Sequence, residues 1–185
     1  MATTNTRAKS VTADDLLRMD PDAPFELIEG VLHDVSPSEF RSSAIASGLH
    51  VEVGHHCKVH GLGYVTGEGG GYRLSRDPDT VVAPDIGFVA RHRLPNGFDF
   101  EGFAPFAPDL AVEVLSPTDR RPDVLRKIEL YLRAGVRLVW IVDPRLKTVA
   151  VHRADGSVSL LDVAGSLGGE DVLPGFSLPV ADIFV

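Results

Sequence analysis

Two acidic residues stand alone in apolar stretches of this sequence. Asp85 lies in Ala83-Pro84-Asp85-Ile86, and Glu113 lies in Val112-Glu113-Val114-Leu115. A carboxylate in a buried strand is costly unless a cation or hydrogen bonds compensate it, and two such acids close together suggest a hard cation between them. Lys127 follows on a predicted helix. Two acids on neighbouring strands with a lysine nearby indicate metal-dependent cleavage of phosphodiester bonds.

Three elements must position these side chains. The sequence predicts strands over 81–90 and 110–115, both rich in apolar and β-branched residues, and a helix over 119–134. If the two strands are neighbours, Asp85 and Glu113 can lie about 5 Å apart.

Asp109 is a second acid that follows a proline, so it competes with Asp85 for the same role. On one strand Asp109 would lie about 13 Å from Glu113, which is too far to share one ion. Asp85 is therefore preferred. It shares a strand face with Gly87, which predicts open space beside its carboxylate.

Lys127 lies at the border of the helix's apolar face. At about 100° per residue it falls about 40° outside the apolar arc, beyond Tyr131. Its ammonium can thus reach the rim of a pocket while its stem lies along the core. The alternative is an ordinary surface lysine paired with Asp123 one turn earlier. The arc itself contains Val124, Leu125, Ile128, Tyr131 and Leu132.

The charge of the chain is acidic overall and basic in one region. The formal net charge of −8 argues against tight non-specific binding to nucleic acid, which depends on phosphate neutralisation. The stretch 118–147 is locally basic, and Arg120 and Arg121 at its start are candidate nucleic-acid contacts. A solvated helix face is the alternative explanation of this run.

The remaining pattern predicts an α/β or α+β fold with a mixed sheet flanked by helices and an N-terminal β-hairpin. We expect residues 1–10 to be a disordered tail and 11–185 to form one domain. The Gly-rich stretch 67–71 lacks the lysine of a phosphate loop and is better explained as a bend between strands. The other expected elements are a short helix over 11–19, a hairpin over 25–35 turning at Glu29-Gly30, a helix over 36–60, strands over 136–142, 147–153 and 158–163, and a capping segment over 171–185 that ends in one helical turn.

Composition sets the broad class. Hydrophobic content of 44% with 24% charged residues is ordinary for a soluble globular protein, and the longest apolar run is too short to cross a membrane. Cys57 is the single cysteine, which fits a reducing cytoplasm. His56 and His60 beside it have zinc-like spacing, although core packing and helix capping explain them more simply.

Several stretches together resemble a known family. The sequence is similar to the bacterial family of "putative restriction endonucleases" (Uma-type, domain of unknown function 820) within the PD-(D/E)XK nuclease superfamily. The resemblance covers about residues 11–185. The matching stretches are Phe25-Glu26-Leu27-Ile28-Glu29-Gly30, Ser36-Pro37, Pro84-Asp85-Ile86, 108–117, the Asp123, Lys127 and Tyr131 helix, Gly135-Val136, 139–144 and Leu173-Pro174-Gly175-Phe176.

The resemblance implies a restriction-endonuclease-like core and assigns roles to individual residues. Asp85 takes the metal-binding aspartate position, and Glu113 takes the acidic position of the E-x-K element. The lysine of that element is replaced by Leu115 here, which makes Lys127 its substitute from the following helix.

Two further points follow from the same resemblance. Family members carry a histidine near the start of the long helix, whereas this chain has none in Glu39-Phe40-Arg41-Ser42-Ser43. Glu26 and Asp123 match family acids and are accessory candidates. For Glu26, a surface charge on the hairpin is the plainer explanation.

The leading hypothesis is a Mg²⁺- or Mn²⁺-dependent DNA endonuclease. Asp85, Glu113 and the Val114 carbonyl would hold the ion, and Lys127 would either orient the attacking water or stabilise charge on the phosphate in the transition state. The first alternative is a catalytically silent module with the nuclease fold that binds nucleic acid or another protein. The second is a structural domain whose acids form salt bridges. We expect DNA and no membrane as partner, and the sequence leaves a homodimer open.

Overall fold

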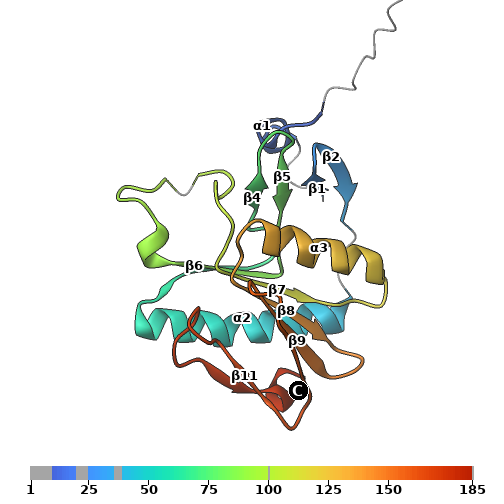
Figure 1. Ribbon diagram of the computed structural model, residues 1–185, viewed down its shortest axis with the longest axis vertical. Helices are drawn as coiled ribbons and strands as arrows, with labels where there is room; N and C mark the ends of the chain where they lie inside the picture. The colour runs from blue at the N-terminus through green and yellow to red at the C-terminus, as the bar shows by residue number, and fades with distance from the viewer. Residues whose placement is uncertain (1–9, 20–24, 36–38, 100, 185) are drawn as a thin grey trace, which may run out of the picture.

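The computed structural model describes residues 10–19, 25–35, 39–99 and 101–184. Most of the expected N-terminal tail and the expected start of the long helix at Ser36-Pro37-Ser38 lie outside the described residues. The elements are arranged around one large sheet with a helix on each face (Figure 1).

The large sheet has six strands in the order β10-β9-β8-β7-β6-β3. Strands β7 and β8 are parallel and are joined by helix α3, and every other neighbouring pair is antiparallel. This confirms the predicted mixed sheet. Its elements are β3 (Gly63–Thr66), β6 (Ile86–Ala90), β7 (Leu110–Val114), α3 (Arg121–Arg133), β8 (Leu138–Asp143), β9 (Thr148–Arg153) and β10 (Val158–Leu161).

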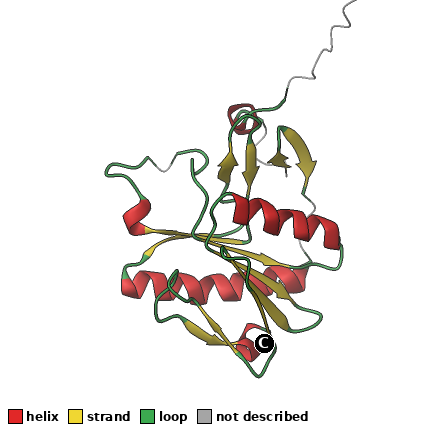
Figure 2. Cartoon of the chain, in the orientation of Figure 1, coloured by secondary structure: helices red, strands yellow, loops and turns green. Residues whose placement is uncertain are grey.

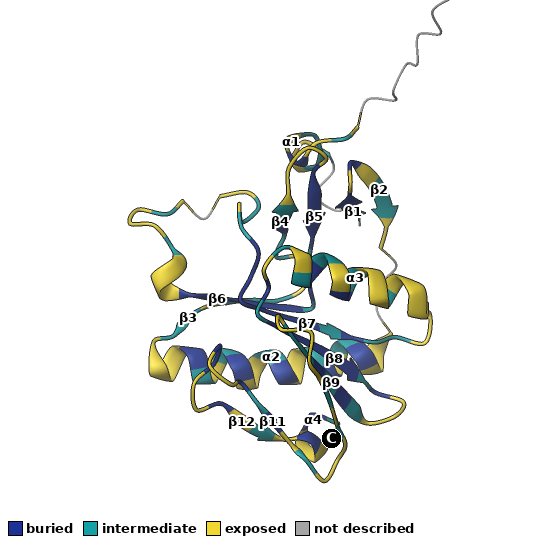
Figure 3. Cartoon of the chain, viewed as in Figure 1, coloured by how far each residue is buried: buried dark blue, intermediate teal, exposed yellow. Residues whose placement is uncertain are grey.

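Two helices cover the two faces of this sheet. Helix α2 (Phe40–His60) packs on one face through Ile45, Leu49 and Val53, and it ends at Gly61 in the left-handed conformation, as expected. Helix α3 packs on the other face through Ile128 and Tyr131. Strand β8 lies between the helices and is buried on both sides (Figure 3), which confirms the prediction of a central strand.

A second sheet lies beside α3 and has four strands in the order β2-β1-β5-β4. It contains the predicted hairpin, whose turn residues Glu29 and Gly30 have φ of 51° and 78°. Helix α1 packs on it and begins with the predicted Thr12 cap. The strands and helix are α1 (Ala13–Leu17), β1 (Phe25–Ile28), β2 (Val31–Asp34), β4 (Tyr72–Ser75) and β5 (Thr80–Val82).

The C-terminal segment adds a small two-stranded sheet and one helical turn on the α2 side (Figure 2). The final turn was predicted, but the two strands were not. These elements are β11 (Ser166–Gly168), β12 (Ser177–Pro179) and α4 (Val180–Ile183), and a short 3₁₀ turn, η1 (Arg91–Arg93), follows β6.

The structure corrects two expected boundaries. The strand expected over 81–90 divides at Ala83-Pro84-Asp85, so that β5 joins the four-stranded sheet and β6 the six-stranded sheet. Proline has no N–H for a sheet ladder, which explains the break. Helix α3 begins at Arg121 rather than Asp119, because the Ser116 N–H donates to the Asp119 carboxylate and forms a turn before the helix.

Candidate active site

Strand β7 presents Glu113 to the face covered by α3. Side chains alternate along a strand, so Leu110, Val112 and Val114 point into the core under α2 while Glu113 points to the other side. Its side chain is 14% exposed. A single acid in this apolar strand is therefore buried between the sheet and α3, as the sequence indicated.

Asp85 precedes β6 and lies opposite Glu113. The antiparallel register pairs Ile86 with Val112 and Gly87 with Ala111, and its continuation places Asp85 across from Glu113. The Asp85 carboxylate accepts a hydrogen bond of 2.6 Å from the Val114 N–H. The two predicted acids are thus brought together at the end of β7.

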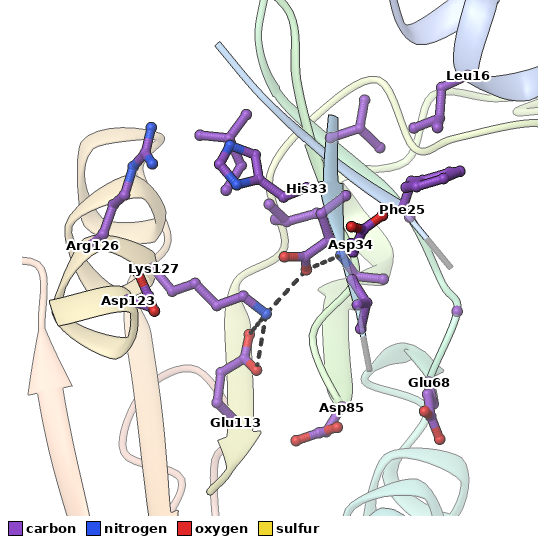
Figure 4. Close-up of a pocket in the computed structure, with 18 of the residues that line it drawn as sticks. Leu16, Phe25, His33, Asp34, Glu68, Asp85, Glu113, Asp123, Arg126 and Lys127 are labelled. Carbon is purple, nitrogen blue, oxygen red and sulfur yellow. Dashed lines mark hydrogen bonds and ion pairs between the residues drawn. The ribbon is translucent and has the colours of Figure 1, made fainter. Parts of the chain in front are cut away.

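Lys127 reaches Glu113 and Glu26 from the second turn of α3. Its Nζ lies 3.0 Å from Glu26 Oε1 and 3.4 Å from Glu113 Oε1. Figure 4 shows the lysine and Glu113 pointing toward each other. Within the described residues Lys127 has no ion pair with Asp123, so the alternative of an ordinary surface pair is wrong.

Glu26 is the largest departure from the sequence prediction. Its carboxylate is buried, with the residue 7% exposed, and it contacts both Lys127 and the Ala83 N–H. The expected explanation as a surface charge of the hairpin is wrong. The hairpin packs against α3 and thereby turns Glu26 toward the lysine.

Tyr131 also contacts Glu113, although the periodicity of the helix placed it only in the apolar core. Its hydroxyl donates a 2.6 Å hydrogen bond to Glu113 Oε1, and the residue is fully buried. The signal was available, because Tyr131 follows Lys127 by one helical turn on the border of the apolar arc.

Burial controls the protonation of the two acids. Burial raises the pKa of Glu113 to about 7, opposed by the Lys127 ammonium and reinforced by the Asp85 and Glu26 carboxylates. Burial also raises the pKa of Asp85, against the opposing effects of the Val114 N–H and Lys127.

For Lys127, the neighbouring charges outweigh the effect of burial on the pKa. Burial alone would lower its pKa, but the Glu113 and Glu26 carboxylates outweigh burial and raise it. The lysine is therefore a permanent cation near neutral pH. In this state it can donate hydrogen bonds to an anion but cannot accept a proton.

A cavity of about 710 Å³ lies between α3 and the four-stranded sheet, and its lining includes Glu26, Asp85, Glu113 and Lys127. Figure 4 shows Asp85, Glu113 and Lys127 on its wall, with His33 and Arg126 nearby. Among the described residues the lining contains seven acids and two permanent cations, Arg126 and Lys127. Its acids are Glu26, Asp34, Glu68, Asp85, Glu113, Asp119 and Asp123.

The other candidates fall outside this group. Asp109 is buried and accepts hydrogen bonds from the Ala90 N–H and Arg93, which gives it a structural role outside this group. Asp123 lines the cavity without contacting Lys127. Arg120 and Arg121 are exposed at the start of α3.

Gly87 does not leave the open space that the sequence predicted. A Cβ at this position would lie 2.5 Å from the Tyr72 hydroxyl, because the Tyr72 ring packs directly on the glycine. The Tyr72 hydroxyl is itself paired with Thr66 at 2.8 Å. Glycine is needed here for the close approach of this ring.

The histidine pair on α2 also has structural contacts. His56 Nε2 lies 3.0 Å from the Pro174 carbonyl, and its ring packs against His60 and Phe176. Among the described residues no three His, Cys, Asp or Glu side chains gather into a metal-binding cluster. The zinc alternative thus has no support from the geometry.

The cavity donors fit a hard divalent cation of the Mg²⁺ type. Asp85 and Glu113 supply carboxylate oxygens to the cavity wall, which Val114 also lines. Mg²⁺ characteristically uses one or two carboxylates and leaves its other positions to water and phosphate, so two opposed acids are enough. Burial raises the pKa of both acids, and the Lys127 ammonium offsets this effect only in part.

We expect Tyr131→Phe to raise the pKa of Glu113 further. The variant keeps the ring but removes the hydroxyl that donates to the carboxylate, and such a bond stabilises the ionised form. Stability at pH 8 should fall by about 1–3 kcal/mol. Carboxyl ¹³C NMR of labelled glutamate would measure the pKa. Tyr64→Phe, at a more exposed position outside the cavity, is the control, and an unchanged Glu113 pKa would contradict the assignment.

Comparison with known proteins identifies the family and the fold of this chain. The sequence profile of the Uma2 family, described as "Putative restriction endonuclease", matches residues 13–181. The chain is also similar to a solved structure from Anabaena variabilis ATCC 29413, described as "a putative nuclease belonging to DUF820". The two share 24% identity and a TM-score of 0.81 over 94% of this chain and 97% of the other. No curated protein matches the chain.

The fold is therefore that of restriction-endonuclease-like nucleases. The chain belongs to the Uma2 family of "putative restriction endonucleases", which confirms the resemblance found in the sequence. Among the described residues, no helix has the length and apolar character that crossing a membrane requires.

Proposed function

We propose that this protein is a Mg²⁺- or Mn²⁺-dependent endonuclease that hydrolyses phosphodiester bonds of DNA. The observation that supports this most directly is that Asp85 just before β6, Glu113 on β7 and Lys127 on α3 line one cavity. Family membership supports the nuclease part of the proposal. The metal and the substrate are inferred from the donors and the charges.

Asp85, Glu113 and the Val114 carbonyl would hold the ion, which would neutralise charge on the phosphate and lower the pKa of an attacking water. Lys127 stays protonated, so its role is to donate hydrogen bonds to phosphate oxygens as negative charge develops. Tyr131 fixes the Glu113 carboxylate by its hydrogen bond. The apolar cluster that contains Ile128 and Val139 excludes water from the side of Glu113 that faces the core.

A catalytically silent module that binds DNA or another protein is the second candidate. The acidic lining of the cavity favours a protein over DNA as the partner of such a module, because the seven described acids outnumber Arg126 and Lys127 and repel a phosphate when no metal ion is bound. The described start of α2 also contributes no histidine, and Ser42 there donates to the Leu115 carbonyl.

A plasmid assay separates the two candidates. The wild-type protein should nick or linearise closed circular DNA with Mn²⁺ or Mg²⁺ and should be inactive with EDTA. Ca²⁺ should support binding more than turnover. Cleavage of neither duplex nor single-stranded DNA in Mn²⁺ would remove the enzyme proposal in favour of the binding module.

We expect Arg120 and Arg121 to contact the DNA backbone. The double substitution to alanine should weaken DNA binding in Ca²⁺ and reduce the dependence of log Kd on log salt by about two charges. Arg133→Ala is the matched control, since Arg133 lies at the other end of α3 and pairs with Glu129. If the double variant binds like the wild type at every salt concentration, the start of α3 is only a solvated face.

A further inference from the structure

Two ion pairs join the β1–β2 hairpin to helix α3. Glu26 pairs with Lys127 at 3.0 Å inside the cavity, and Glu29 pairs with Arg126 at 3.5 Å on the surface. The first pair is largely buried, whereas the second has side chains 44% and 62% exposed. Arg126 and Lys127, which are consecutive on α3, thus pair with two acids of the same hairpin, one pair on the surface and the other in the cavity.

We propose that Glu26 is a positioning residue, which holds the Lys127 ammonium above Glu113 so that the lysine can act on substrate. The part of this proposal that concerns turnover rests on the proposed nuclease function. The part that concerns the order of the lysine does not.

The lysine needs a holder because its own attachment is flexible. A lysine side chain has four rotatable bonds and loses much conformational entropy when it is fixed. Its contact with Glu26 at 3.0 Å is shorter than its contacts with the two Glu113 oxygens, both at 3.4 Å. Glu26 is therefore the closer of the two partners of the ammonium.

Glu26 is itself rigidly placed. Strand β1 is paired on both sides, with Glu26 opposite His33 on β2 and Leu27 opposite Val81 on β5. The Ala83 N–H donates to the same Glu26 oxygen that contacts the lysine. The four-stranded sheet thus fixes the Glu26 carboxylate. The carboxylate in turn fixes the Lys127 ammonium on α3.

The geometry favours this role over that of a third metal ligand. Glu26 Oε1 already contacts Lys127 and Ala83, and Glu26 does not join Asp85 and Glu113 in a cluster of three donors among the described residues. A lysine held by Glu113 alone would compete with any cation for that carboxylate. Glu26 gives the ammonium a partner outside the candidate ligand set.

The experiment compares Glu26→Ala and Glu26→Gln with the matched surface variants Glu29→Ala and Glu29→Gln. The first readout is ¹⁵N relaxation of the Lys127 ammonium in the metal-free protein, with Lys58 and Lys147 as reference lysines. Glu26→Ala should make the Lys127 ammonium markedly more mobile. The Gln variant keeps an oxygen acceptor and should restore most of the order, and both Glu29 variants should resemble the wild type.

The second readout is steady-state cleavage of an oligonucleotide in Mn²⁺. Glu26→Ala should lower kcat by about a hundredfold with a KM within about threefold, because a displaced group costs turnover rather than binding. Glu26→Gln should retain activity within about fivefold. Calorimetric Mn²⁺ affinity should be unchanged in both variants.

Three results would overturn the proposal. The first is an equally ordered Lys127 ammonium in Glu26→Ala. The second is a tenfold or greater loss of Mn²⁺ affinity, which would make Glu26 a ligand. The third is a loss of activity that merely follows the folded fraction measured by circular dichroism. If the wild type cleaves nothing, the nuclease proposal fails, and the ammonium relaxation alone decides whether Glu26 positions the lysine.

Discussion

Glu113→Gln and Asp85→Asn should each abolish Mn²⁺ binding and DNA cleavage, and Glu113→Gln should make the metal-free protein more stable at pH 8. Both substitutions preserve side-chain volume and an oxygen acceptor, so the Val114 N–H and the Tyr131 hydroxyl keep their bonds. What is lost is the negative charge that a hard cation requires.

The gain in stability follows from the raised pKa of Glu113. Between its ordinary value of 4.5 and about 7, the folded protein keeps a proton that the unfolded chain has released. Wild-type stability therefore falls as the pH rises through this window, by roughly 3 kcal/mol at most. Glutamine does not ionise, so Glu113→Gln should remove this fall and match the wild type more closely at pH 5 than at pH 8.

Urea unfolding at pH 5 and pH 8 and calorimetric Mn²⁺ titration would measure these effects. Glu129→Gln is the control, because it removes one acid from the exposed side of α3, away from the cavity. Retained Mn²⁺ affinity in either cavity variant would reject the site assignment. A Glu113→Gln protein that is less stable than the wild type at pH 8 would show that the charge on Glu113 stabilises the fold.

Lys127→Met should have the opposite effect on stability while also removing activity. Methionine keeps the volume of the stem but leaves Glu26 and Glu113 without their shared cation. Breaking a buried ion pair in this way costs about 3–5 kcal/mol at a pH where the acids are ionised. At pH 5 the cost should be smaller, because the acids can take up protons instead.

Turnover of the Lys127→Met variant should fall by at least about a hundredfold, which is the usual effect of losing one preorganised charge-stabilising group. Cleavage kinetics and urea unfolding at two pH values would test both parts. Lys58→Met on the exposed side of α2 is the control. Wild-type turnover in the folded Lys127→Met protein would exclude a catalytic role for the lysine.

The residues of the site that could be predicted are those whose placement depends on local periodicity. Strand alternation put Glu113 on one face, and the 100° step of the helix put Lys127 on the border of the apolar arc. The pairing of Asp85 with Glu113 also followed, because the two predicted strands are short and adjacent in the chain. Their catalytic and metal-binding roles remain predictions.

Glu26 was named as an accessory candidate, but its burial and its contact with Lys127 were not predicted, because they depend on how separate layers pack. Glu26 is buried only because a second sheet lies against α3, and its sequence stretch reads the same whether or not that contact forms. The ring of Tyr72 over Gly87 is likewise a contact between strands of different sheets. The break at Pro84, by contrast, had a local signal in the proline itself.

The distribution of the site over the chain has a consequence for protein synthesis. Strand β1 leaves the ribosome first, whereas β7 and α3 follow only after more than half of the chain has been made. A nascent chain therefore carries Glu26 without the Lys127 ammonium as its partner, and the candidate site cannot assemble until α3 docks. The site of the proposed nuclease therefore forms only late in synthesis, after most of the chain has been made.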